Sequence, residues 1–233
     1  SEMLSKGRTC FYDESGGVEN YWHHQRQSTT PVSYSDRRLV LPKTIGDSRL
    51  VAKNHSARLW DMGDGAACLE FKSKMNSVDG DIVAMLNSAI EHAESDFDAL
   101  VIGNHDPRAF SAGANLMMIM MGAQQKAWDD VRASISGFQN AVLGLRHSSI
   151  PVVAAPFGLT LGGGAEICLG ADALQAHAEL YMGLVEVGVG LIPGGGGCFG
   201  LLHNQQADGP DIDPIVYVRD TFMTIGMAKV ATS

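Results

Sequence analysis

Two short glycine clusters, each close to a glutamate, are the feature of this sequence that most limits its fold. Leu-Gly-Gly-Gly-Ala-Glu runs from Leu161 to Glu166, and Ile-Pro-Gly-Gly-Gly-Gly begins at Ile192, shortly after Glu186. Glycine has no side chain, so the backbone can turn sharply there and a ligand can lie against main-chain N–H groups. A carboxylate beside such donors can move a proton once they hold an oxygen of the ligand. The two clusters therefore indicate an acid/base site.

Composition limits the class of protein. With 233 residues, 45% of them hydrophobic and 18% charged, the chain is long enough to bury a sizeable core. It contains no apolar run of the roughly 18 residues that a membrane span needs and no opening signal peptide, so we expect a cytoplasmic protein. The net charge of −9 argues against a nucleic-acid partner. The four cysteines lack Cys-x-x-Cys spacing, so we expect reduced core thiols and no metal site.

The chain divides by pattern into two parts. Residues 1–56 mix polar, glycine and aromatic residues without sustained helical or strand periodicity, which predicts an N-terminal arm or linker. Residues 57–233 are predicted to form one α/β domain. Because the chain starts at Ser1 rather than Met and ends at Ser233 without a helix stop signal, we expect an excised part of a longer protein, truncated at its C-terminus.

Within 57–233 a strand, strand, helix cycle occurs twice. Two antiparallel strands flank the turn Gly63–Gly65, and Asp79 is placed to cap a following helix with one apolar face. A buried strand at 99–102 follows. A second cycle begins near Pro151, where 152–155 is a β-branched run and the glycines 162–164 lead into a helix. A long amphipathic helix is predicted over 128–146, and an exposed loop over 204–213.

Several glycine motifs are excluded. No glycine is followed by Lys-Ser or Lys-Thr as in a phosphate-binding P-loop, no Gly-x-Gly-x-x-Gly fingerprint opens a βαβ unit, and Gly-x-Ser-x-Gly does not occur. What remains is Phe-Ser-Ala-Gly-Ala-Asn from Phe110 after one strand and the triple glycine after another. Each places small residues at a strand-to-helix turn, where free N–H groups can bind a developing oxyanion. Two such turns could hold one oxygen from two sides.

In order and spacing these motifs resemble the crotonase superfamily of acyl-CoA enzymes, from about Arg58 to the end of the chain. Glu166 and Glu186 match the pair characteristic of enoyl-CoA hydratases, whereas isomerases of the same fold generally rely on one acid. More narrowly, the segments 151–166 and 181–193 resemble the C-terminal hydratase region of bacterial bifunctional 3-hydroxyacyl-CoA dehydrogenases. Residues 1–56 would then be the connector from a missing dehydrogenase domain.

The resemblance implies a fold, a reaction and a set of site residues. The fold is a crotonase-like spiral of repeated β-β-α units, and the reaction is hydration of trans-2-enoyl-CoA to 3-hydroxyacyl-CoA in fatty-acid β-oxidation. Glu166 and Glu186 would be the catalytic residues, and the N–H groups of Ala114 and Gly163 would form the oxyanion hole. The other residues implied to bind substrate are Ala112, Gly113, Gly162, Pro193 and Gly194.

The resemblance also implies partners. The substrate is an acyl-CoA, this domain needs no cofactor or metal, and NAD would belong to the missing dehydrogenase domain. A homo-oligomer, a trimer in the family, is expected if C-terminal helices are present. Two other functions remain open, an enoyl-CoA isomerase and a truncated module without catalytic activity.

Two groups of residues stay ambiguous at this point. Lys72 and Lys74 are candidates to meet the CoA phosphates, although solvated lysines are the favoured interpretation. The methionines at 117, 118, 120 and 121 could form an adaptable surface that contacts the acyl chain, although ordinary core is favoured.

Overall fold

A computed structural model gives the fold. It describes Ser5, Gly7, Leu41 and the ranges 12–15, 18–23, 25–31, 46–208 and 213–232. The chain forms two compact units, Ser1–Gly46 and Asp47–Ser233. Among the described residues, none of the helices combines the length and the apolar composition that a membrane crossing requires.

The first unit contains regular structure that the sequence pattern does not predict. Strands β1 (Tyr12–Ser15), β2 (Val18–His23) and β3 (Ser28–Pro31) form an antiparallel sheet in the order β1-β2-β3. The sequence pattern, which lacks sustained strand periodicity, did not predict these three strands. The division between the units also differs from the predicted one after Ser56, because β4 (Leu50–Lys53) pairs with a strand of the second unit.

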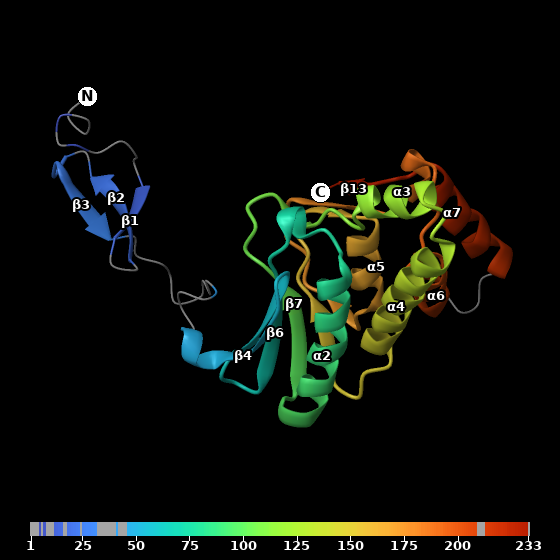
Figure 1. Cartoon of the computed structure of the whole chain (residues 1–233), viewed down its shortest axis with the longest axis horizontal. Coiled ribbons are helices and arrows are strands. Elements are labelled where there is room, and N and C mark those ends of the chain that lie inside the picture. Colours follow the sequence, from blue (N-terminus) through green and yellow to red (C-terminus); the bar gives the residue numbers. More distant parts are fainter. Residues whose placement is uncertain are drawn as a thin grey trace. The chain divides into compact units, whose positions relative to one another are not determined.

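The second unit is built on two sheets (Figure 1). The larger sheet has the order β11-β9-β7-β6-β5-β4, antiparallel from β4 to β6 and parallel from β6 to β11. The smaller sheet has the order β13-β12-β10-β8, in which β10 runs parallel to both of its neighbours and β13 antiparallel to β12. The strands not yet delimited are β5 (Ala57–Asp61), β6 (Ala66–Phe71), β7 (Ala99–Gly103), β8 (Ala109–Ser111), β9 (Val152–Ala154), β10 (Gly158–Leu161), β11 (Ala173–Leu174), β12 (Leu180–Gly183) and β13 (Ala231–Thr232).

Six α-helices of the described residues complete this unit. They are α2 (Gly80–Asp96), α3 (Leu116–Gln124), α4 (Trp128–Arg146), α5 (Gly163–Gly170), α6 (Gly197–Asp208) and α7 (Pro214–Gly226). Three short 3₁₀ helices, Asp47–Arg49, Lys74–Asn76 and Glu186–Val189, lie between other elements. The loop predicted over 204–213 is wrong in its first part, because α6 continues to Asp208.

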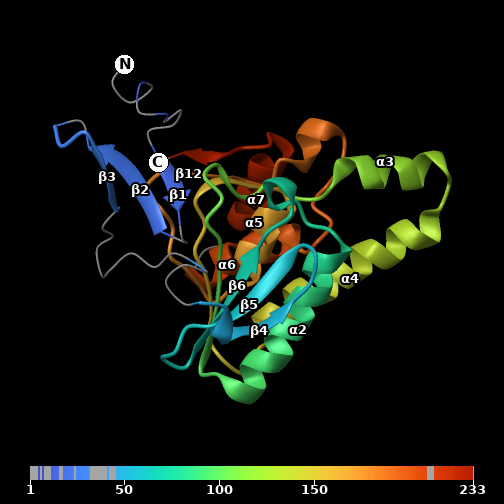
Figure 2. The ribbon, with the colours of Figure 1, turned by 60° about the vertical axis from the view of Figure 1, so that its left-hand side comes forward.

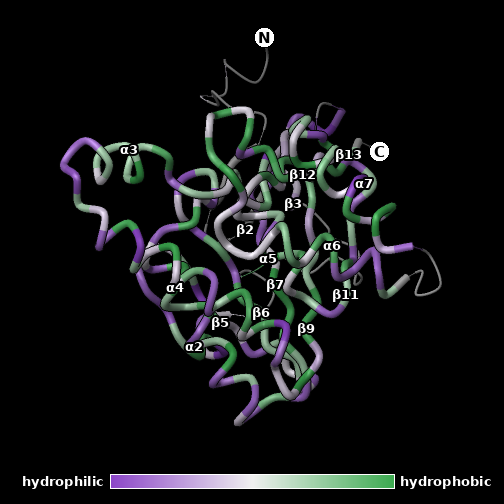
Figure 3. The backbone as a smooth tube through the Cα atoms, turned by 90° about the vertical axis from the view of Figure 1, so that its right-hand side faces the viewer, coloured by the Kyte–Doolittle hydropathy of each residue, from purple (hydrophilic) through white to green (hydrophobic). Residues whose placement is uncertain are grey.

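Helix α2 shows why the local pattern specifies the structure. Asp79 caps it, accepting a hydrogen bond from the Ile82 N–H at 2.8 Å through Oδ1. Its apolar face packs on the larger sheet and on α4, with Ile82, Leu86 and Ala89 fully buried. The central strands of that sheet are largely coloured as hydrophobic in Figure 3, as expected for parallel strands covered by helices. The core of the domain lies between this sheet, α2, α4 and α5.

Some predicted core residues lie at the surface instead. No residue of α3 is buried, and the methionines 117, 118, 120 and 121 are 44–63% exposed, so their interpretation as ordinary core is wrong. In Figure 2, α3 and the start of α4 extend away from the sheets. Cys68 and Cys168 are buried thiols as expected, whereas Cys198 is exposed and Cys10 lies outside the described residues.

The topology places the two glycine turns together. Residues 112–115 follow β8, and Gly162 follows β10. Because β8 and β10 are parallel neighbours, their carboxyl ends lie at the same edge of the smaller sheet. The end of β12 joins them there, since the Gly162 N–H donates to the Gly183 carbonyl at 2.9 Å. The candidate site lies at this edge.

Candidate active site

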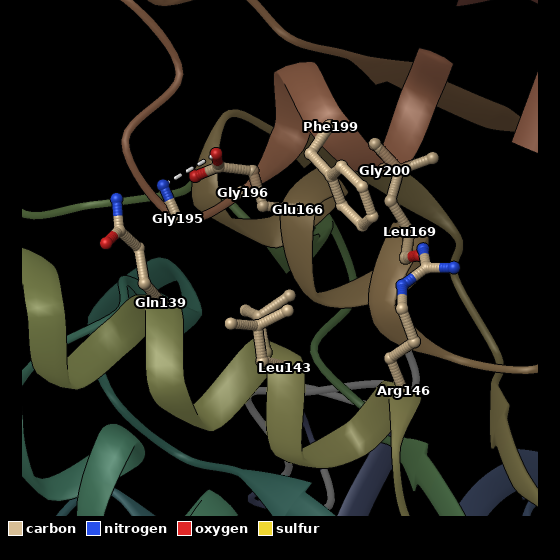
Figure 4. Close-up of a pocket in the computed structure, with 10 residues that line it drawn as sticks. Gln139, Leu143, Arg146, Glu166, Leu169, Gly195, Gly196, Phe199 and Gly200 are labelled. Atoms are coloured by element: carbon tan, nitrogen blue, oxygen red, sulfur yellow. Dashed lines mark hydrogen bonds between the residues drawn. The ribbon is translucent and has the colours of Figure 1, made fainter. Parts of the chain in front are cut away.

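Glu166 lies in the first turn of α5 and is almost completely buried, with 2% of the residue exposed. The helix begins after Gly162, whose φ of 53° and ψ of −121° are available only to glycine without strain. Glu166 Oε1 accepts hydrogen bonds from the Gly195 N–H at 2.7 Å and the Gly197 N–H at 2.9 Å. Figure 4 shows the first of these bonds. The second glycine cluster therefore holds the carboxylate of the first.

Glu186 enters the site from the 3₁₀ helix Glu186–Val189, which follows β12. Both of its carboxylate oxygens are buried, and among the described residues neither has a hydrogen-bond partner. A Cβ atom on Gly162 would lie 3.4 Å from Glu186 Oε1, so this carboxylate lies against the glycine that opens α5. A buried carboxylate without a partner is costly for the fold and is common where a side chain meets a substrate.

The pKa values of both carboxyl groups are raised. Burial raises the pKa of Glu166 from 4.5 to about 7, and the charge of Glu186 adds to this, while the N–H groups of Gly197 and Gly195 act in the opposite direction. Burial also raises the pKa of Glu186. A group whose pKa lies near neutral pH can both accept and return a proton under physiological conditions. Glu166 therefore has the protonation behaviour that acid/base catalysis requires.

The raised pKa of Glu166 predicts a pH dependence of stability. Between pH 4.5 and about 7 the folded state binds the proton of Glu166 more tightly than the unfolded chain, so its contribution to stability is lost as the pH rises through this window. The expected loss is about 3 kcal/mol, at 1.36 kcal/mol per pKa unit. Urea unfolding at pH 5, 6, 7 and 8 measures it. In Glu166→Gln the decline should be smaller by this amount, and parallel profiles for the two proteins would contradict the prediction.

The two predicted oxyanion donors lie on touching segments. A Cβ atom on Gly163 would lie 3.5 Å from the Ala114 nitrogen, and one on Gly113 would lie 3.1 Å from the Gly163 nitrogen. Gly163 is the first residue of α5, so its N–H has no acceptor within the helix. Gly113 has a φ of +84°, which turns the chain from β8 toward α3. The structure thus brings together the two turns that the sequence predicts.

The other predicted substrate-binding residues lie on these two turns, as Ala112, Gly113 and Gly162 do, or on the loop that contains Pro193 and Gly194. The Ala112 N–H donates to the Met75 carbonyl at 3.1 Å, so this donor is used within the fold. Pro193 is buried, and the Gly194 carbonyl accepts from Gln139 Nε2 at 2.7 Å. Sequence reasoning missed the role of Gln139, which fixes the 194–197 loop to α4. Since no motif includes a single glutamine on an amphipathic helix, the sequence held no signal for it.

Phe138 is a second residue whose role was missed. A Cβ atom on Gly195 would overlap Phe138 Cε1 and would lie 2.7 Å from Glu166 Oε2. The ring therefore packs closely over the loop that binds the carboxylate. The sequence places Phe138 on the apolar face of the predicted helix 128–146, which indicates that the residue is packed. The periodicity does not indicate which loop this face contacts.

A polar cavity of about 530 Å³ begins beside the Ala114 turn. Its lining includes Lys72, Lys74 and Asn115, the residue after Ala114. Lys72 Nζ lies 3.8 Å from Glu70 Oε1, while Asn115 caps α3 by accepting from the Met117 N–H at 3.2 Å. Both candidate lysines thus lie on one cavity next to the site. Among the described residues, no group of three His, Cys, Asp or Glu side chains could hold a metal ion.

Comparison with solved structures defines the class of fold. The chain is similar to the DspI protein of Pseudomonas aeruginosa, with a TM-score of 0.65 and 28% identity, over 78% of this chain and 64% of that one. It also shares the fold of an enoyl-CoA hydratase from Bacillus anthracis, with a TM-score of 0.62 and 20% identity, over 76% of this chain and 65% of that one. The α/β architecture is the crotonase fold, as predicted.

Sequence comparison gives the family. Residues 64–205 match the family model described as Enoyl-CoA hydratase/isomerase, and the chain belongs to this family. It is 44% identical over 232 residues to a probable 3-hydroxyacyl-CoA dehydrogenase of Bacillus subtilis, covering all of this chain. The chain spans 29% of that relative's length, and so corresponds to less than a third of it.

Proposed function

We propose that this chain hydrates trans-2-enoyl-CoA to 3-hydroxyacyl-CoA, a lyase reaction of fatty-acid β-oxidation. The buried pair of carboxylates carries the proposal, because Glu186 lies against Gly162, the glycine before α5, and Glu166 lies in the first turn of that helix. Hydration of a double bond needs one group to take a proton from water and another to deliver a proton to carbon. Two buried carboxyl groups with raised pKa values suit these two roles.

The N–H groups of Ala114 and Gly163 would bind the thioester oxygen. When water attacks the β-carbon of a conjugated thioester, electrons move onto this oxygen and an enolate develops. Preorganised donors favour that charge over the neutral ground state, with a contribution of about 3 kcal/mol each in comparable oxyanion holes. The contact between residues 113–114 and 162–163 supports this role.

The proposed proton steps use both acids. Glu166 would orient a water molecule and take its proton as the oxygen bonds to the β-carbon, and Glu186 would give its proton to the α-carbon as the enolate collapses. One molecule of water is thereby added across the double bond. Glu166 ends protonated and Glu186 ionised, so a proton exchange with solvent restores both groups. Among the residues that the structure describes, the Glu186 oxygens have no hydrogen-bond partner, which supports the role of Glu186 as the acid that faces substrate.

The remaining predicted residues would shape the substrate site. Ala112, Gly113 and Gly162 lack bulky side chains where the thioester would lie, and Pro193 with Gly194 would fix the loop that binds Glu166. Lys72 and Lys74, on the adjoining polar cavity, would meet the CoA phosphates. No cofactor takes part in these steps.

We also propose that the chain is the hydratase part of a longer bifunctional enzyme. The name of the Bacillus subtilis relative, and the share of its length that this chain covers, support this. A dehydrogenase part would use NAD to oxidise the 3-hydroxyacyl-CoA that this chain forms.

The test is a crotonyl-CoA assay that follows the loss of the conjugated enoyl-thioester absorbance. We expect the absorbance to fall and 3-hydroxybutyryl-CoA to form. A 3-enoyl-CoA supplied in parallel separates hydration from isomerisation, since conversion to the 2-enoyl isomer without water addition would favour an isomerase. No turnover of crotonyl-CoA, by this chain or by a longer protein that contains it, would overturn the proposal.

A further inference from the structure

A second cavity, of about 170 Å³, lies between α4, α5 and α6 (Figure 4). Glu166 and Gly195 line one end of it, so it adjoins the carboxylate that the proposed reaction places at the β-carbon. Its walls are mainly the apolar side chains of Val142, Leu143 and Phe199. Leu143 and Phe199 are 41% and 54% exposed, so an apolar group bound here would remove hydrophobic surface from water.

Arg146 lines the far end of the cavity, but its guanidinium group is already engaged. Nη2 donates to the Leu169 carbonyl at the C-terminal end of α5, and Nη1 and Nη2 each lie 3.4 Å from Asn204 Oδ1. The guanidinium carbon also lies 5.8 Å from the centre of the Phe199 ring. These contacts use donors of both terminal nitrogens within the fold, as expected for an arginine near a helix C-terminus. The far end therefore offers a bound group mainly the apolar surfaces of Leu169 and Phe199.

The dimensions of the cavity set the size of its occupant. Gln139 and Arg146 both line it, and seven residues of α-helix separate them by about 10 Å at 1.5 Å per residue. A Cβ atom on Gly200 would lie 3.1 Å from Leu169 Cβ, so the glycine keeps the far end open. An apolar cavity of about 150 Å³ holds benzene in another protein. The present cavity has room for about six carbon atoms.

We propose that this cavity binds the part of the acyl group beyond the β-carbon. It would make the protein selective for linear, apolar acyl groups of medium length. The inference rests on the proposed function, because that function places the β-carbon beside Glu166. Leu143 is the residue that determines specificity, since its side chain lies between the Glu166 end and the Arg146 end in Figure 4. The exposed methionines of α3 do not line this cavity.

Binding of saturated acyl-CoAs tests the inference without requiring turnover. The dissociation constants of butyryl-CoA and octanoyl-CoA would be measured by calorimetry for the unmodified chain, Leu143→Phe and Leu143→Ala. We expect octanoyl-CoA to bind at least about tenfold more tightly than butyryl-CoA, because several further methylene groups become buried. Leu143→Phe should remove most of this preference by filling the cavity. Leu143→Ala should keep it and extend it to decanoyl-CoA.

The control is Ser134→Phe, an exposed position of α4 outside the cavity, which should leave the preference unchanged. An acyl-CoA with a terminal carboxylate, such as suberyl-CoA, should bind more weakly than octanoyl-CoA. An equal preference in Leu143→Phe and the unmodified chain, or tighter binding of suberyl-CoA, would overturn the inference. Because binding is measured apart from turnover, loss of the hydratase activity and loss of the chain-length preference remain separate results.

Discussion

Replacing Glu166 with glutamine is expected to lower kcat/KM for crotonyl-CoA by about 10²- to 10⁴-fold, the usual contribution of a positioned general base. The amide keeps the size of the side chain, and its oxygen still accepts from the Gly195 and Gly197 N–H groups, so the loop should stay in place. What is lost is the group that takes the proton from water. The enoyl-thioester absorbance assay measures the effect.

The matched control is Glu91→Gln, which changes an exposed glutamate of α2 and should leave kcat/KM unchanged. Glu186→Gln should also lower hydration, since the α-carbon then loses its proton donor. Full hydration activity in Glu166→Gln would contradict the assigned role. If Glu166→Gln still isomerised a 3-enoyl-CoA, the single remaining acid at Glu186 would indicate an isomerase.

The second large effect is expected for Gly113→Ala. At a φ of +84° the new methyl group is strained, and it would lie 2.6 Å from the Leu161 carbonyl oxygen and 3.1 Å from the Gly163 nitrogen. We expect a loss of about 2–4 kcal/mol in the free energy of unfolding, as the sum of the backbone strain and the overpacking. Because relief of the contact must move one donor away from the other, kcat/KM should fall as well. Urea unfolding and the crotonyl-CoA assay measure the two effects.

Gly80→Ala serves as the control for the same chemical change. No atom lies within 4 Å of a Cβ placed on Gly80, and this residue is in the first turn of α2. Alanine there should be neutral or stabilising by up to about 1 kcal/mol. A Gly113→Ala protein as stable and as active as the unmodified chain would show that the two turns do not need their close contact.

The elements with strong local signals were predictable from the sequence. Asp79 and the apolar repeat after it define α2, and the helix predicted over 128–146 has the bounds of α4. The order of the glycine motifs also predicted that the turns after β8 and β10 meet. In each case residues close together in the sequence specify the structure. They do so through a helix cap, a repeat of apolar residues at helical spacing, or a turn that only glycine adopts without strain.

The remainder depends on contacts between distant residues. The strands β1–β3 contain polar residues that show no sustained alternation, and the polar end of α6 reads as a loop although it is helical to Asp208. The apolar composition of α3 does not reveal that its methionines lie at the surface. Likewise the bond from Gln139 to Gly194 joins residues 55 positions apart, and the cavity beside it exists only once three helices are packed.

The two backbone N–H groups on Glu166 Oε1 bear on how the proposed enzyme would recover after each reaction. Burial alone would favour the protonated carboxyl group and would leave the proton from water on Glu166. The Gly195 and Gly197 N–H groups favour the ionised carboxylate, so they oppose retention of the proton by Glu166. They keep the pKa of Glu166 near neutral rather than higher. The loop that orients the base thus also promotes release of its proton, and the speed of return to the starting state depends on a glycine-rich backbone that contributes no side chain.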